Sequence, residues 1–128
     1  MNTSVVYVDR SLVRPGKLAE LKEAIAELSS DFEANEPELI AYLVFLDDTE
    51  TQMTVMHVHR DVASLELHMK IGGPRFPRFA PLVELKSIDV YGAVNDEVMA
   101  RLRDKAQTLG GATVEAHKSC TGFLRTPA

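Results

Sequence analysis

Three of the chain's four histidines fall within twelve residues, at His57, His59 and His68. Imidazole titrates near neutral pH, so such a cluster suits general acid–base chemistry. Residues 53–59 have the composition of a strand, on which side chains alternate, so His57 and His59 share one face. His68 belongs to a short helix expected at 62–70 and sits beside its apolar stripe. We expect His68 to face a core or a pocket, and we rank it first and His57 second as a catalytic base.

The two strand histidines also suggest a different chemistry, because a His-x-His pair on one face can chelate a metal ion. A third ligand is then needed from another strand, and the candidates are Asp9, Asp89 and Glu115. The spacing from the pair to the carboxylate of Glu66 differs from the usual His-x-His barrel pattern. We therefore favour a polar stripe at a subunit interface over a metal centre, and we expect neither a metal nor another cofactor.

The length and composition fit one domain that spans residues 1–128. Apolar residues make up 45% of the chain and charged residues 26%, which is ordinary for a globular protein. The net charge of −5 argues against a nucleic-acid surface, and no apolar run is long enough to span a membrane. The first residues lack a secretory signal, and Cys120 has no second cysteine for a disulfide or a zinc site. These features predict a cytoplasmic protein.

Hydrophobic periodicity predicts five strands and three helices in one uninterrupted domain. The strands are expected at about 4–13, 39–46, 53–60, 84–94 and 112–124. The helices are expected at about 15–32, 62–70 and 96–109. Pro15 opens the first helix, and Asp61 and Asn95 cap the other two. The first four strands and two helices follow the βαββαβ order of a ferredoxin-like α+β fold, and residues 95–128 append an αβ unit whose strand joins either its own sheet or a partner's.

Alternation along the strands predicts two sheet faces of different character. One face is apolar enough to carry the helices, and its expected members are Val6, Val8, Met56, Val58, Ile88, Val90, Val114 and Ala116. The other face mixes apolar and ionisable residues, and its expected members are Val5, Tyr7, Asp9, Tyr42, Val44, Val55, His57, His59, Asp89, Tyr91, Glu115 and His117. With the helices on the first face, the second would be exposed in a monomer. We therefore predict a homodimer packed through the second face, with the ionisable groups lining a semi-enclosed cavity.

Short motifs lie at the boundaries of the expected elements. Pro15-Gly16-Lys17 follows the first strand, Glu36-Pro37 precedes the second, and His68 follows Asp61 at a distance of seven residues. Together these motifs resemble the antibiotic biosynthesis monooxygenase family of dimeric α+β barrels. The third strand of that family commonly carries Glu-x-Trp-x-Asp, with a histidine seven residues after the aspartate. The resemblance covers about residues 4–94 and leaves the appended αβ unit outside.

The chain also departs from the family's pattern. His57 stands where the family's glutamate is usual, His59 stands in place of its tryptophan, and Glu38 replaces the glycine after Glu-Pro. Haem-degrading members of the family use an asparagine on the first strand and a tryptophan on the second helix. This chain contains no tryptophan, and Asp9 lies near the place of that asparagine. The sequence therefore gives less support to a haem-degrading function.

The resemblance implies a homodimer in which each subunit holds a pocket between its sheet and its helices. Some members of the family oxidise polycyclic phenols to quinones with O2 and no cofactor, a reaction that starts from a phenolate. We therefore expect a cofactor-independent monooxygenase for a small aromatic or phenolic substrate, with His68 or His57 as the base. The expected substrate-binding residues are His59, Asp9, Tyr7, Tyr42 and Arg78.

Each assignment has a simpler alternative. His68 could close the end of its helix and bind a backbone carbonyl. Lys70, Arg75 and Arg78 could gate the pocket and attract an anionic ligand, or they could form an ordinary solvated loop. The whole domain could be a non-catalytic barrel that binds a small hydrophobic ligand or only dimerises. The clustered histidines favour catalysis, whereas the two replaced family positions favour binding.

Overall fold

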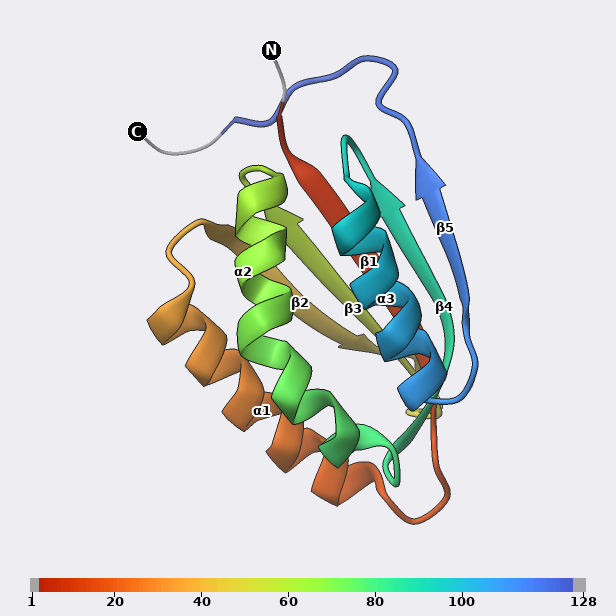
Figure 1. Cartoon of the computed structure of the whole chain (residues 1–128). Coiled ribbons are helices and arrows are strands. Elements are labelled where there is room, and N and C mark those ends of the chain that lie inside the picture. The colour runs from red at the N-terminus through yellow and green to blue at the C-terminus, as the bar shows by residue number, and fades with distance from the viewer. Residues whose placement is uncertain (1–2, 126–128) are drawn as a thin grey trace.

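The computed structural model of the chain describes residues 3–125. These residues form one five-stranded sheet with the helices packed against a single face (Figure 1). The strands are β1 (Val5–Val13), β2 (Leu39–Leu46), β3 (Gln52–His59), β4 (Val83–Tyr91) and β5 (Thr113–His117). The helices are α1 (Leu18–Asn35), α2 (Val62–Gly72), the 3-10 helix η1 (Gly73–Phe79) and α3 (Asp96–Thr108).

The strand order β2-β3-β1-β4-β5 combines a ferredoxin-like core with one added strand. β1 lies between β3 and β4 and is antiparallel to both, and β2 pairs antiparallel with β3. The α+β class and the βαββαβ order predicted from the sequence are confirmed. β5 runs parallel to β4, with α3 as the crossover that a parallel connection requires. The last strand therefore joins its own sheet, which decides the alternative that the sequence left open.

Two helices start at side chains that cap exposed backbone amides. The side-chain oxygens of Asp61 and Asn95 each accept a 2.9 Å hydrogen bond from a first-turn amide, at the starts of α2 and α3. Both caps agree with the sequence prediction. The predicted start of the first helix at Pro15 is wrong, because Pro15 and Gly16 form a turn and α1 begins at Leu18. Gly16 has a φ of 77°, which glycine adopts without strain.

Four elements end away from the expected residue: α1 ends at Asn35 and not at 32, α2 at Gly72 and not at 70, β4 at Tyr91 and not at 94, and β5 at His117 and not at 124. α2 continues past residue 70 to Gly72, against which the ring of Phe76 packs closely. A Cβ atom at Gly72 would lie 2.8 Å from that ring, so the glycine leaves the room that this packing needs. β5 ends at His117, well before the expected residue 124, because β4 ends opposite it at Tyr91 and offers no further partner.

The predicted assignment of the two sheet faces is wrong. Paired residues on neighbouring strands point to the same side, and Tyr7 pairs with His57 on one strand and Val90 on the other. Tyr7, His57 and His59 are buried beneath the helices. The polar face is thus the inner one, and Ile88 and Val90 belong to it and not to the outer apolar set. Alternation shows which residues of one strand share a face, but neither the register between strands nor the side that the helices take.

The outer face of the sheet carries no helix (Figure 1). Apolar residues gather on its β1, β2 and β3 part, and titratable residues on its β4 and β5 part. Its residues include Val6, Val8, Ala41, Leu43, Phe45, Met56 and Val58, together with Asp89, Tyr91, Glu115 and His117, which were expected on the face of Tyr7. Leu43 and Phe45 are 48% and 50% exposed. An apolar sheet face of this kind is prone to association. The homodimer stays a prediction, now through the opposite face from the one expected.

The hydrophobic core lies between the helices and the inner face of the sheet. The helices contribute the buried residues Leu21, Ala24, Leu28, Phe32, Leu65, Met69, Val98, Leu102 and Ala106. The sheet contributes Val5, Val55, Leu85, Ile88 and Val90. Full burial of a large apolar side chain stabilises the fold by about 1.5–3 kcal/mol. None of the helices within residues 3–125 has the length and apolar character that crossing a membrane requires.

Candidate functional site

A pocket lies inside this core, between the inner face of the sheet and the overlying helices. Its cavity volume is about 40 Å³. Most of its wall is apolar and comes from Ile25, Leu28, Phe32, Met53, Val55, Phe76, Phe79, Val83, Leu85 and Leu109. The polar residues on the wall are Asp9, Ser11, Tyr42, His57, His68 and Lys105. An apolar cavity with a few convergent polar groups is the usual form of a small-molecule site.

The first polar pair of the site joins α2 to the end of α1. His68 Nδ1 lies 3.0 Å and 3.1 Å from the two carboxylate oxygens of Glu36, the residue that follows α1. Both side chains are buried. Burial raises the pKa of Glu36 to about 7, and burial together with the charge of Lys105 lowers the pKa of His68 to about 3. Burial thus favours the neutral form of both partners.

The protonation of Glu36 decides what His68 can do. When Glu36 is ionised, it accepts the hydrogen bond from Nδ1–H of His68, and Nε2 keeps a free lone pair. When Glu36 is protonated, it donates to Nδ1, and the ring proton is carried by Nε2. Nε2 of His68 is buried without a hydrogen-bond partner among the described residues. In the ionised state Nε2 is therefore the hydrogen-bond acceptor of a neutral ring.

His57 extends the polar part of the wall from β3. Its ring stacks on Tyr7 at a centroid distance of 4.0 Å and lies 4.9 Å from the ring of His68. His57 Nδ1 is 2.9 Å from the backbone oxygen of Tyr7, which assigns the ring proton to Nδ1 and leaves Nε2 as an acceptor. Burial lowers the pKa of His57, so the ring stays neutral. Tyr42 stands edge-on to His57 at 5.0 Å, and burial raises the pKa of its hydroxyl.

His59 is buried beside these rings but is not part of the pocket wall. Its Nδ1 is 2.7 Å from Oγ of Ser64, near the start of α2, and its Nε2 has no partner within residues 3–125. The ring lies 5.2 Å from that of His68. Burial lowers the pKa of His59 to about 3. His59 therefore lies behind His68, as a neutral neighbour that a ligand in the pocket does not touch.

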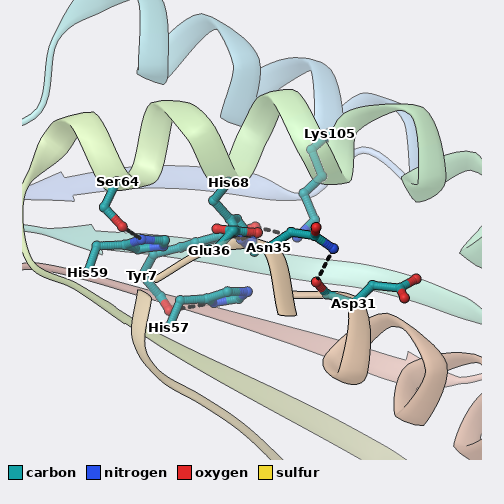
Figure 2. Close-up of polar contacts among 9 residues, drawn as sticks. All are labelled: Tyr7, Asp31, Asn35, Glu36, His57, His59, Ser64, His68 and Lys105. Carbon is teal, nitrogen blue, oxygen red and sulfur yellow. Dashed lines mark hydrogen bonds and ion pairs between the residues drawn. The ribbon is translucent and has the colours of Figure 1, made fainter. Parts of the chain in front are cut away.

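The last polar group comes from α3, in the unit that lies outside the family resemblance. Figure 2 shows Lys105 reaching from α3 toward Tyr7, beside His68. Lys105 is buried, its Nζ lies 3.0 Å from Asp9 Oδ2, and it donates a hydrogen bond to the Tyr7 hydroxyl. Sequence reasoning missed this residue. The available signal was that Lys105 falls within the apolar stripe of α3, seven residues after Val98 and three after Leu102, an unusual place for a lysine.

The structure brings most of the predicted site residues together. His57, His68, Asp9 and Tyr42 line the pocket, and Tyr7 packs against His57. His68 binds a carboxylate and not the backbone carbonyl that the simpler alternative expected. The clustering of titratable residues in the sequence therefore predicted a real cluster in space.

Arg78 lies apart from this cluster, on the surface of η1. Its guanidinium is 3.2 Å from the carboxylate of Glu27 on α1, and its side chain is 54% exposed. Arg75 forms a similar pair with Asp31. These two arginines fasten η1 to α1, and neither lines the pocket. Their contacts fit an ordinary solvated segment better than a pocket gate.

The strand histidines do not converge with the expected carboxylates into a metal site. Both histidines lie on the inner face of the sheet, whereas Asp89 and Glu115 lie on the outer face, and Asp9 is held by Lys105. Within residues 3–125, the group of three ligating side chains that does converge is Asp89, Glu115 and His117. Asp89 and His117 are already paired at 2.9 Å. Contacts with protein groups thus already occupy two of its three side chains, because Asp89 also pairs with Arg10.

No family model matches the chain, and no curated protein matches it by sequence. Solved structures match its fold. MupZ from Pseudomonas fluorescens matches with a TM-score of 0.70 at 18% identity, over 98% of this chain and 91% of MupZ. A variant of SnoaB, a cofactor-independent oxygenase from Streptomyces nogalater, matches with a TM-score of 0.60 at 18% identity, over 71% of this chain and 93% of SnoaB. An antibiotic biosynthesis monooxygenase candidate from Bacteroides thetaiotaomicron matches with a TM-score of 0.54 at 19% identity, over 65% of this chain and 85% of that protein.

These similarities concern the fold, because identities of 18–19% are too low to carry a reaction from one protein to another. The match to MupZ covers 98% of the chain and so includes α3 and β5. The unit that supplies Lys105 is therefore shared with at least one solved structure. The chain has the fold of the antibiotic biosynthesis monooxygenase-like proteins, extended by one helix and one parallel strand.

Proposed function

We propose that this chain is a cofactor-independent monooxygenase for a small phenolic or related aromatic substrate, with His68 as the general base. The observation that carries the proposal is the buried pair of His68 and Glu36, with the unpartnered Nε2 of His68 beside an apolar pocket. A base on an apolar wall can take the proton of a bound phenol without competition from bulk water.

The reaction starts from a phenolate, because electron transfer to O2 begins from the anion. His68 Nε2 takes the hydroxyl proton, and ionised Glu36 stabilises the imidazolium that forms. The phenolate passes one electron to O2, and the resulting phenoxyl and superoxide radicals combine to form a bond between oxygen and a ring carbon. The proton returned by His68 gives a hydroperoxide, which loses water and leaves a quinone. One phenol and one O2 thus give one quinone and one water.

The other residues of the cluster have supporting roles in this proposal. His57 is the second candidate for the base, because Nε2 is the acceptor of its neutral ring. Tyr42 and Asp9 orient the substrate from the wall of the pocket. Tyr7 holds His57 by stacking, and His59 lies one ring further back.

The similarity in fold to SnoaB, itself a cofactor-independent oxygenase, supports this class of reaction. At 18% identity the similarity supports the class and leaves the substrate open. We propose further that the chain works as a homodimer in which each subunit has its own pocket.

Oxygen uptake by the purified protein tests the proposal. Small phenols and naphthols are supplied in a chelator-treated buffer without flavin, and quinone formation is followed by absorbance. His68→Gln should lower turnover by about 10²–10⁴-fold, the usual size of a general-base contribution. His117→Gln changes a histidine of the outer face and should keep full turnover. A requirement for metal or flavin, or full turnover by His68→Gln, would show the proposal to be wrong.

A binding protein without catalysis is the second candidate, and one observation favours it. Polar groups on the pocket wall, including Asp9, His57 and Lys105, are already hydrogen-bonded to other parts of the chain. A ligand can then be held by the apolar wall with no reaction. Tight binding of phenols without oxygen uptake from any of them would favour this second function.

A further inference from the structure

Lys105 is a buried cation that the proposed reaction does not yet use. Lysine is almost never fully buried unless it is paired, because desolvation of an ammonium is costly. Here the partners are Asp9, 3.0 Å away, and the hydroxyl of Tyr7. Apolar residues of similar size often stabilise a core as well as a buried ion pair does, so stability alone does not explain this one. Its place on the pocket wall points to a role in binding.

The ammonium of Lys105 still has a hydrogen-bond donor to offer. An ammonium carries three N–H groups, and among residues 3–125 Asp9 and Tyr7 account for two of them. Nζ also lies 4.4 Å from the ring centroid of Phe76 and 4.9 Å from that of Tyr7. Lys105 and Phe76 line the inner pocket and also a second pocket among α2, η1 and α3. An oxygen atom of a ligand in either space can therefore accept the third N–H.

We propose that Lys105 is the anion-binding group of the inner pocket: it holds the deprotonated hydroxyl oxygen of the ligand, so that the protein takes small aromatic or enolic hydroxyl compounds as their anions. This inference rests on the proposed function for the place where the ligand binds, but it needs no reaction with O2. A charge-assisted hydrogen bond is roughly twice as strong as a bond between neutral partners. The pocket should therefore bind a phenolate more tightly than the parent phenol.

The charges near Lys105 set the strength of this preference. The titratable groups that line the two pockets or pack against them are Tyr7, Asp9, Glu36, Tyr42, His57, His59, His68, Arg101 and Asp104. The three histidines are neutral, so Asp9 and ionised Glu36 are the charges of the inner pocket that oppose a bound anion. Removing the charge of Asp9 should strengthen anion binding, whereas removing that of Lys105 should weaken it.

Binding of 4-nitrophenol in the absence of O2 tests this inference. The phenolate of the probe absorbs visible light strongly and the phenol does not, so a pH titration gives the pKa of the bound probe. In the unaltered protein that pKa should fall by at least about one unit, a tenfold preference for the anion. Lys105→Met should remove the shift, and Asp9→Asn should enlarge it. A disturbance of the fold alone would not shift the pKa of the bound probe in opposite directions in the two variants.

Matched ligands and variants complete the test. Nitrobenzene lacks the hydroxyl, so its affinity should be the same in the unaltered protein and in Lys105→Met. Lys86→Met removes an exposed lysine of β4 and should leave the affinity for both ligands unchanged. If Lys105→Met unfolds because Asp9 is left unpaired, the double variant Asp9→Asn/Lys105→Met carries the comparison. The inference is overturned if the protein binds neither probe, binds 4-nitrophenol as the neutral phenol, or shows the same shift without Lys105.

The result is separable from that of the proposed function. A Lys105-dependent shift in the pKa of the bound probe without oxygen uptake would support the anion-binding pocket and refute the oxygenase function. Oxygen uptake without a shift in the pKa of the bound probe would support the oxygenase function and refute the proposed role of Lys105.

Discussion

Glu36 and His68 meet at 3.0 Å in the interior of the protein, although 32 residues of chain separate them. One residue follows the last turn of α1, and the other lies in the middle of α2. Burial moves the pKa of the histidine down to about 3 and that of the glutamate up to about 7. The sequence points to a histidine as the group that titrates near neutral pH, whereas burial in the structure raises the pKa of the glutamate toward that range and lowers that of the histidine below it.

Turnover of a phenol should rise with pH through about 7, because ionised Glu36 directs the free lone pair of His68 to Nε2. Glu36→Gln should flatten this rise and lower the plateau about 10–100-fold. A neutral amide loses roughly 1.5–3 kcal/mol of charge-assisted hydrogen bonding to the imidazolium, which corresponds to that factor. Rate measurements across the neutral range for the two proteins check the prediction. A level profile for the unaltered protein would count against it.

Folding stability should fall as the pH is lowered from about 6.5 toward 3. Burial lowers the pKa of His57 and lowers those of His59 and His68 to about 3, so the folded state keeps these rings neutral where the unfolded chain protonates them. Glu36 acts in the opposite sense between 4.5 and about 7, because its folded pKa is raised. Because three histidines oppose one glutamate, the net effect is a loss of folding stability as the pH is lowered.

Urea unfolding at several pH values measures this loss of stability. His59→Asn should reduce the slope of unfolding free energy against pH by about 1.4 kcal/mol per pH unit, the effect of one proton. Equal stability across the acid range would mean that the buried histidines are not held neutral.

The chain should be a homodimer at micromolar concentration, joined through the outer face of the sheet. Leu43 and Phe45 are exposed there, beside Met56 and Val58, and a second copy can cover them. Leu43→Glu should weaken the dimer at least about tenfold, because it places carboxylates in an apolar interface. Leu67→Glu changes an exposed leucine of α2 and is the matched control. Sedimentation that shows only a 14.2 kDa species would refute the prediction.

Removal of residues 112–128 should destabilise the fold. β5 pairs with β4 over Thr113–His117, and each ladder hydrogen bond that is lost costs about 1 kcal/mol. Removal of residues 118–128 leaves this pairing intact and should change the melting temperature little. Thermal unfolding of the two shortened chains checks the difference. An unchanged melting temperature for the larger deletion would show that β5 is dispensable.

Local signals made the order of the elements predictable. A helix start can be predicted from one capping side chain, as at Asp61 and Asn95. A strand can be predicted from its content of β-branched residues. The inner face was not predictable in the same way, since polar groups at Asp9, His57 and His59 resemble a solvated surface. Their burial depends on partners from the helices and neighbouring strands that satisfy them, and such contacts are not contained in any one segment.

The candidate site was predictable where its residues are close in sequence. His57, His59 and His68 lie in one segment, so their types and spacing were visible. Glu36 was noted only as part of a motif before the second strand, because its contact with His68 needs α1 and α2 to pack. Lys105 lies in a unit outside the family resemblance, and its contact with β1 follows from the parallel return of the chain through α3.

The contacts of Lys105 also bear on the order in which the protein folds. Lys105 meets Tyr7 and Asp9 across 98 and 96 residues of chain. The pairing of β1 with β4 already spans a similar length of chain, since Val6 lies opposite Tyr91. Once that pairing has formed, docking of α3 closes only the short segment between β4 and α3, which costs little additional loop entropy. In a refolding experiment, recovery of ligand binding should therefore coincide with recovery of the sheet, without a separate slow phase for α3.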